Sequence, residues 1–360
     1  MELECPLGGS VGNSGAMTEV TWDEAPSLQN PLLVVAFEGW FDAGECATGA
    51  IQWIVDQYEA RRVAKIDPEE FFDFQENRPH VEIADDGERR IKWPSLDAHV
   101  IENDFPHDLV LLAGLEPRMR WRTFCDSVVE IARDTACEMV VTLGAMVAGV
   151  PHSRPSEVKG SAANPDLAYR LGLDRPSYQG PTGIIGTLHD ALDSAELPVI
   201  SLRVGVPHYV AGPPNPKGTR ALLAEFEKVT GVPTGYRDLD HSVLEWEQRV
   251  SDAVEQDSEI IGYVRQLEEE ADRVVSADLP SGDDLAAEFQ KFLRDQRDEG
   301  ATVSVRRRLR LVGAANGPPT LNTPSPQPLE LPWGERTGHA VPWLQGSLSR
   351  CPDSPFVELN

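Results

Sequence analysis

The chain of 360 residues carries a formal net charge of −27, and 41% of its residues are hydrophobic. The length suggests two or three structural units, and the apolar content is sufficient for an ordinary core. The acidic charge disfavours nucleic acid or an anionic membrane as a partner, because the long-range electrostatic field has the wrong sign. The five cysteines form no CxxC pair, which indicates neither a disulfide framework nor a zinc site and fits a cytoplasmic location.

The first segment, residues 1–30, is rich in Gly, Ser and Asn and then acidic, without periodicity. We expect it to be a flexible N-terminal arm. Glu2 and Glu4 stand where a signal peptide would be basic, so no signal peptide is predicted. The longest apolar run, residues 139–150, is interrupted by Thr142 and Gly144 and is too short to span a bilayer.

From residue 31 to residue 236, apolar runs of strand length alternate with segments of helical spacing. Strands are predicted at 32–37, 62–66, 109–113, 138–143 and 199–204, and helices at 45–58, 119–133, 183–194 and 216–230. A hairpin is predicted from segments 80–84 and 89–93, which flank a turn whose Gly87 supplies a positive φ. Continuous Val, Leu and Ile strands separated by helices predict a three-layer α/β/α core domain with a mixed, mainly parallel sheet, the hairpin making it mixed.

The last two segments differ from this core. Residues 237–298 repeat apolar positions at spacings of three and four, which predicts a helical appendage of two or three helices. Its last group of apolar residues is Leu285, Phe289, Phe292 and Leu293. Residues 299–360 hold many prolines and no periodicity, so we expect them to be largely disordered. Removing the residues after Gly313 should leave the melting temperature unchanged.

The most organised stretch is VVAFEGWFDAGECATGAIQWI, residues 34–54, where a strand ends in an acidic, Gly-punctuated loop before a helix. Such a loop can hold a phosphate, a metal or polar ligand, or only itself and a partner subunit. Its carboxylates repel a phosphate, and we expect no metal and no cofactor. The loop candidates are Glu38, Gly39, Trp40, Phe41, Asp42 and Gly44.

Capping is the simplest use of these carboxylates. We expect Asp42 or Glu45 to satisfy the free N–H groups at the start of the helix. Gly39 is expected to adopt a backbone angle that a residue with a Cβ would resist. Trp40 and Phe41 are either core plugs or interface anchors, since interfaces favour buried aromatic residues.

Hydrolase signatures are incomplete in this sequence. The G-x-S-x-G match at residues 8–12 has no strand before it and no helix after it. A base could come from His152, His189 or His208, and a nucleophile from Ser153, Ser156 or Cys46. His152 and His208 form the better pair, because each follows Gly-Val-Pro after an apolar strand. If those strands are neighbours, the two loops converge on one edge of the sheet. No residue is assigned a catalytic role.

Four segments resemble the proteasome assembly chaperone 2 family in its actinobacterial form, from about residue 32 to residue 295. They are FEGWFDAGECATGA, VVTLGAMVAGVPHSRP, PTGIIGTLHDAL and SLRVGVPHYVAGPPNPKGTRALLAEFEKVTG. The last adds Tyr209 and Asn215 to the ligand or interface candidates. The resemblance implies a phosphorylase/hydrolase-like fold, a homo-oligomer such as a trimer, and no established catalysis.

The same resemblance implies proteasome subunits as partners, since eukaryotic and archaeal relatives help to assemble proteasome α-rings. Archaeal relatives dock through a C-terminal hydrophobic-Tyr-x tail. This sequence ends FVELN at residues 356–360 and lacks that tyrosine, so the docking device is expected to be absent or different.

Three hypotheses of function follow from the sequence. The first is a non-catalytic assembly chaperone or scaffold. The second is a hydrolase or phosphorylase of the same fold, whose nucleoside-hydrolase version would need a cluster of Asp residues around calcium. The third is a small-molecule sensor that uses the cleft beside residues 39–44.

Overall fold

The computed structural model describes residues 19–278 except 85, 104, 211 and 213. Within these residues the chain divides into two compact units, one that runs to Glu268 and one that begins at Glu269. The fold described below is that of the first unit. The predictions for residues 1–18 and for residues after 278, including the proline-rich tail, lie outside the described residues.

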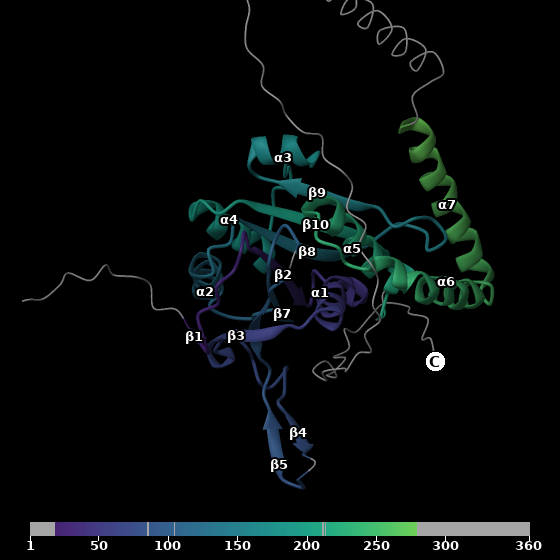
Figure 1. The fold of residues 1–360 in the computed structure, drawn as a ribbon. Helices are drawn as coiled ribbons and strands as arrows, with labels where there is room; N and C mark the ends of the chain where they lie inside the picture. Colours follow the sequence, from purple (N-terminus) through teal and green to yellow (C-terminus); the bar gives the residue numbers. More distant parts are fainter. Residues whose placement is uncertain (1–18, 85, 104, 211, 213, 279–360) are drawn as a thin grey trace, which may run out of the picture. The chain divides into compact units, whose positions relative to one another are not determined.

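The core is an eight-stranded sheet with the order β1-β3-β6-β7-β2-β8-β10-β9 (Figure 1). The four central strands run parallel to one another: β7 (Leu109–Leu115), β2 (Leu32–Glu38), β8 (Met139–Ala148) and β10 (Val199–Pro207). The outer strands pair antiparallel: β1 (Val20–Trp22), β3 (Arg61–Ile66) and β6 (Leu96–Ile101) on one side, and β9 (Val158–Ala162) on the other.

The sheet is mixed, as predicted, but its antiparallel pairs have another origin. The predicted hairpin exists as β4 (His80–Ile83) and β5 (Arg89–Lys92), yet it forms a separate two-stranded sheet and contributes nothing to the large one. Three of the seven neighbouring strand pairs are parallel, so parallel pairing is confined to the centre. Strands β1, β6 and β9 were not predicted, because outer strands carry polar residues that interrupt the apolar run.

Helices cover both faces of the sheet. Alternate residues of β2 explain this arrangement, since successive side chains of a strand point to opposite faces. Leu32, Val34 and Ala36 pack with α1 (Cys46–Gln57) and α5 (Pro216–Thr230), whereas Leu33, Val35 and Phe37 pack with α2 (Trp121–Asp134) and α4 (Ile184–Ser194). The short helix α3 (Pro165–Leu171), which was not predicted, adds Ala168 to the first of these cores.

The segment predicted to form a helical appendage contains two helices within the described residues. Its helix α6 (Asp240–Val254) buries Trp246 and Val250, and α7 (Ser258–Asp278) buries Val264 within the first unit. The third predicted group, at residues 285–293, lies outside the described residues. No helix in the described ranges is both long and apolar enough to cross a membrane.

Candidate functional site

The opening loop, residues 39–45, lies at the carboxyl end of β2. In the sheet β2 lies between β7 and β8, both parallel to it. The connection after β2 leads through α1 to β3, on the β7 side, whereas the connection after β8 leads to β9, on the opposite side. Ligands of open α/β sheets bind at such a reversal of strand order. The loop therefore occupies the place at which this class of fold usually offers a cleft.

Gly39 and Glu116 fix the first part of the loop. Gly39 has φ of 153°, and a Cβ there would lie 2.6 Å from Oε2 of Glu116, so the prediction that this position needs glycine is confirmed. The same carboxylate oxygen accepts a hydrogen bond from the backbone N–H of Trp40 at 3.1 Å. The Trp40 side chain, however, is 90% exposed.

Phe41 packs against the neighbouring strand and acts as a plug. Its carbonyl oxygen accepts a hydrogen bond from the N–H of Ala145 at 2.8 Å. Its ring lies over Gly144, where any Cβ would overlap the ring. Half-buried Phe41 therefore joins the core on the α2 and α4 face, whereas Trp40 does not.

Asp42 caps helix α1. Its buried carboxylate accepts hydrogen bonds from the N–H groups of Ala47 at 2.6 Å and Thr48 at 3.3 Å, and from the Thr48 hydroxyl. The expected cap is thus confirmed for Asp42. Glu45 occupies the residue just before the helix in a left-handed conformation, with φ of 52°, and its side chain makes no capping bond.

Gly44 brings the loop against the segment that starts α5. Its carbonyl oxygen accepts a hydrogen bond from the N–H of Asn215 at 2.9 Å, and a Cβ on Gly44 would lie 2.9 Å from the Cβ of Asn215. The Asn215 side chain in turn caps α5 by accepting from the N–H of Gly218 at 3.0 Å. Two of the segments quoted above for the family resemblance therefore meet in one place.

Burial and neighbouring negative charges disfavour the ionised form of the carboxyl groups in this loop. Burial, and then the charges of Glu45 and Asp42, raise the pKa of Glu38 to about 7. Burial raises the pKa of Asp42 to about 6, although its bonds to Thr48 and Ala47 oppose that rise. Within the described residues, no three His, Cys, Asp or Glu side chains group closely enough to hold a metal ion.

A second polar cluster forms where the loops after β8 and β10 meet. The two strands are parallel neighbours, which confirms the expected convergence of the two histidine-bearing loops. Tyr209 stands between the histidines: its ring centroid is 5.9 Å from that of His152 and 5.6 Å from that of His208. His208 also meets Tyr263 of α7 at 5.3 Å.

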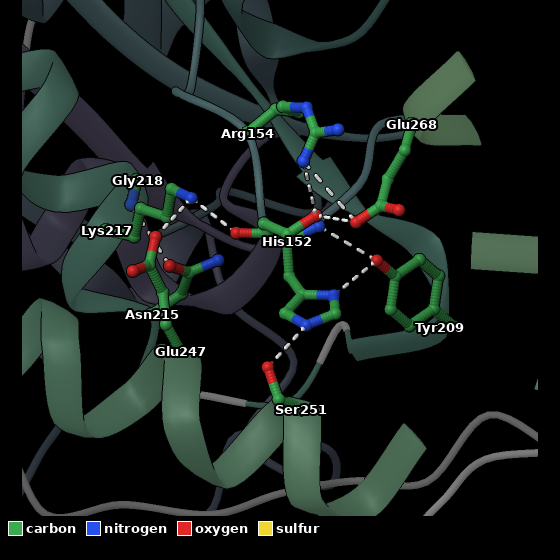
Figure 2. A network of polar contacts seen from close by, with 10 residues as sticks. His152, Arg154, Tyr209, Asn215, Lys217, Gly218, Glu247, Ser251 and Glu268 are labelled. Atoms are coloured by element: carbon green, nitrogen blue, oxygen red, sulfur yellow. Dashed lines mark hydrogen bonds and ion pairs between the residues drawn. The ribbon is translucent and has the colours of Figure 1, made fainter. Parts of the chain in front are cut away.

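His152 is only 4% exposed and uses all of its polar groups (Figure 2). The Tyr209 hydroxyl accepts from the backbone N–H of His152 at 2.8 Å and lies 2.8 Å from Nδ1, while Nε2 lies 3.1 Å from the Ser251 hydroxyl. Because the Tyr209 hydroxyl accepts a hydrogen bond from the amide N–H, its own O–H is free to donate a hydrogen bond to Nδ1. The proton of the neutral imidazole then lies on Nε2, which donates a hydrogen bond to Ser251. Burial, and then the Lys217 cation, lower the pKa of His152.

Lys217 connects this cluster to helix α6. Its buried amine donates to the carbonyl oxygen of His152 and pairs with the Glu247 carboxylate, as Figure 2 shows. On the other side, Arg154 pairs with Glu268 at 3.5 Å. The cluster therefore fastens the loop after β8 to α5, α6 and the start of α7.

The other candidate nucleophiles and bases are engaged with other partners or buried. Burial raises the pKa of the Cys46 thiol well above its usual value, so a reactive thiolate is disfavoured. The Ser153 hydroxyl donates a hydrogen bond to the carboxylate of Glu268. His189 contacts the Thr142 hydroxyl at 2.8 Å, and burial, followed by the Arg203 charge, lowers its pKa to about 4.

Several residues of both clusters were missed at the level of sequence. Glu116 and Ser251 carry no motif, and only the fold brings them to residues 38–44 and to His152. Lys217 had a usable signal, because it follows the Asn-Pro start of α5 at a position where a lysine faces the unfavourable end of the helix dipole. A lysine kept there needs another partner, here Glu247.

Comparison with known proteins places the chain in a family. The model of the PAC2 family matches residues 36–254. This range includes the loop after β2 and the polar cluster around His152 as far as Ser251. The chain belongs to the PAC2 family. A search of curated proteins gave no match to this PAC2 chain.

Solved structures agree with this assignment. A PAC2 family protein from Streptomyces avermitilis is 41% identical with a TM-score of 0.61, over 65% of this chain and 99% of that one. A proteasome-assembly chaperone homologue from Mycobacterium tuberculosis is 38% identical with a TM-score of 0.59, over 65% and 99%. PbaB, an archaeal proteasome activator from Pyrococcus furiosus, is 15% identical with a TM-score of 0.53 over 66% and 99%, and shares the fold.

The cap at Asp42 gives a first prediction. Asp42→Ala should lower the free energy of unfolding by about 1–2 kcal/mol, because two helix N–H groups and the Thr48 hydroxyl lose their acceptor. Asp42→Asn should cost less, since it keeps one acceptor oxygen. Equilibrium urea unfolding measures both, and EDTA should leave the melting temperature of the wild type unchanged. A fall in the melting temperature on adding EDTA, reversed by calcium, would show that Asp42 holds a metal ion and would contradict the capping role.

Glu38 gives a second prediction, on pH. A carboxyl group whose pKa is higher in the folded than in the unfolded chain stabilises the fold while protonated. That contribution is complete below the usual pKa of 4.5 and is lost as the pH rises through about 7. Relative to wild type, the melting temperature of Glu38→Gln should therefore rise between about pH 4.5 and about pH 8. Curves of melting temperature against pH that run parallel for the wild type and Glu38→Gln would contradict this prediction. Glu59→Gln, at an exposed site, serves as the control.

Proposed function

We propose that this PAC2 chain is a non-catalytic assembly chaperone or scaffold of the cytoplasm, and that its copies associate through the Trp40 loop. The observation that carries the proposal is the 90% exposure of the Trp40 side chain on a loop whose other residues are held in place. Burial of a large aromatic ring against a partner contributes favourable free energy through the hydrophobic effect. Buried aromatic residues of this kind anchor protein interfaces.

The rigidity of the loop supports this use of Trp40. Its backbone N–H is tied to Glu116, the preceding residue must be glycine, and the following ring is plugged against Gly144. A side chain presented on a fixed backbone loses little freedom when a partner binds, so more of the contact energy appears as affinity.

The comparisons support a chaperone more than a hydrolase. The Mycobacterium relative, which is 38% identical, is described as a proteasome-assembly chaperone homologue. We therefore take proteasome subunits as the first client to test.

One contact favours the alternative hydrolase. Ser251 and His152 lie within hydrogen-bond distance, which is the spacing of a nucleophile and its base. The tautomer set by Tyr209 nevertheless makes Nε2 the donor to Ser251, so this nitrogen cannot accept the proton of that hydroxyl. However, a neutral hydroxyl replaces the carboxylate that stabilises the imidazolium in such triads. Ser251 also lies inside helix α6, and neither it nor His152 lines the groove found beside them. We therefore interpret the pair as a structural clamp.

A third prediction tests the proposed role of Trp40. At concentrations where the wild type is assembled, Trp40→Ala should shift the protein toward monomer in analytical ultracentrifugation, with unchanged far-UV circular dichroism. Tyr169→Ala is the matched control, because Tyr169 is also 90% exposed and lies on a different element, α3.

Other outcomes would contradict the proposal in different ways. Loss of the fold in Trp40→Ala would make Trp40 a core residue. An unchanged assembly would remove the loop from self-association. Covalent labelling of Ser251 by a fluorophosphonate probe would favour the hydrolase, since only an activated serine reacts readily.

A further inference from the structure

Four carboxyl groups lie in and beside the Trp40 loop. Glu38 ends β2, and its carboxyl group is close enough to Asp42 and Glu45 to be affected by both of their charges. Glu116, which follows β7, holds the backbone N–H of Trp40 with its own carboxylate. Among the described residues, none of the four pairs with a lysine, arginine or histidine side chain. The exposed ring of Trp40 therefore rises from a group of carboxyl groups that lacks a cation.

The elements packed against this loop supply no free positive charge. Strand β8 has no charged residue, and the one charged residue of α1 is the acidic Asp56, near its far end. The first turn of α5 meets the loop through Asn215, and its Lys217 is already paired with Glu247. An ionised Glu38 therefore meets only like charges, in a partly buried place.

This setting favours the neutral form of Glu38. Burial, followed by the charges of Glu45 and Asp42, raises the pKa of Glu38 to about 7. Near neutral pH the carboxyl group is therefore divided between its neutral and its ionised form. A modest further change in its surroundings then decides which of the two forms prevails.

A partner that covers Trp40 makes such a change. A stable protein interface buries about 800 Å² on each partner, which is more than one loop provides. A contact centred on Trp40 therefore also removes water from Glu38, and loss of water disfavours the ionised carboxylate. A second copy of this chain, whose net charge is −27, brings no positive field that would keep Glu38 ionised.

We propose that association of two copies through the Trp40 loop takes up a proton at Glu38, so that assembly strengthens as the pH falls. The proposal rests on the self-association proposed above and adds its regulation. Glu38 is neutral in the contact and partly ionised in the free chain, so the contact is weakened as the pH rises above neutrality. The loop would then act as a pH-sensitive switch of assembly.

The pH dependence of assembly tests this coupling in the full chain. In analytical ultracentrifugation at constant ionic strength, the association constant of the wild type should fall between about pH 6 and about pH 9, by at most about tenfold per pH unit for each Glu38 in the contact. Glu38→Gln is neutral at every pH, so it should remove most of that fall and assemble at high pH as the wild type does at low pH. Glu59→Gln, at an exposed site, should follow the wild type.

Calorimetry detects the proton directly and needs no variant. Assembled wild type is diluted near neutral pH into phosphate and into Tris, two buffers that differ in their enthalpy of ionisation. The heats of dissociation should differ between the buffers, because the protons released by Glu38 are taken up by the buffer. The same dilution of Glu38→Gln should give a smaller difference. Equal heats for the wild type in both buffers would overturn the coupling.

Failure can be assigned to one proposal or the other. An association constant that is constant with pH, that rises with pH, or that falls equally in Glu38→Gln overturns the coupling, while an assembly that depends on Trp40 still stands. An assembly that Trp40→Ala leaves unchanged, or a wild type that is monomeric at every concentration and pH, overturns the association through Trp40 and the coupling with it.

Discussion

The close crossing of α1 and α5 at their first turns is the constraint on which the site depends. Backbone and small residues make the approach possible, since a Cβ at any of three glycines would press on the facing helix. The facing pairs are Gly44 with Asn215, Gly49 with Thr219 and Gly218 with Cys46. The crossing aligns the loop after β2 with the start of α5, and Asp42 and Asn215 then cap the two helices side by side. The place where open α/β sheets bind ligands is thereby filled with the chain's own groups, and Trp40 is left outside.

The central part of this fold could be predicted from the sequence. Strands that are buried on both faces, such as β2, are visible in the sequence as continuous apolar runs. Asp42 could be predicted as a cap because it precedes a segment with helical spacing. Strands β6 and β9 were missed, since an outer strand with residues such as Asp97 or Lys159 has no such run. The hairpin was found, but its separation from the sheet depends on long-range pairing that local patterns do not encode.

The candidate sites show the same limit. Two loops with similar histidines could be paired once their strands were assumed to be neighbours, and they are. The sequence could not predict that His152 forms hydrogen bonds with Tyr209, Ser251 and Lys217, because these partners lie 57 to 99 positions away in the chain. The difference matters for function, since a buried histidine whose Nε2 proton is donated to Ser251 holds elements together and cannot take a proton from that hydroxyl.

The proposed role of Trp40 requires that the helix crossing hold its loop in the conformation that a partner recognises. The most direct test is a double-mutant cycle of Gly218→Ala and Cys46→Ala, followed by both urea unfolding and sedimentation. The new Cβ at residue 218 would overlap the Cys46 sulfur, so Gly218→Ala should weaken the fold and the self-association together. Cys46→Ala in the same chain should restore both. A loss of stability in Gly218→Ala without any change in assembly would contradict this coupling of the helix crossing to self-association.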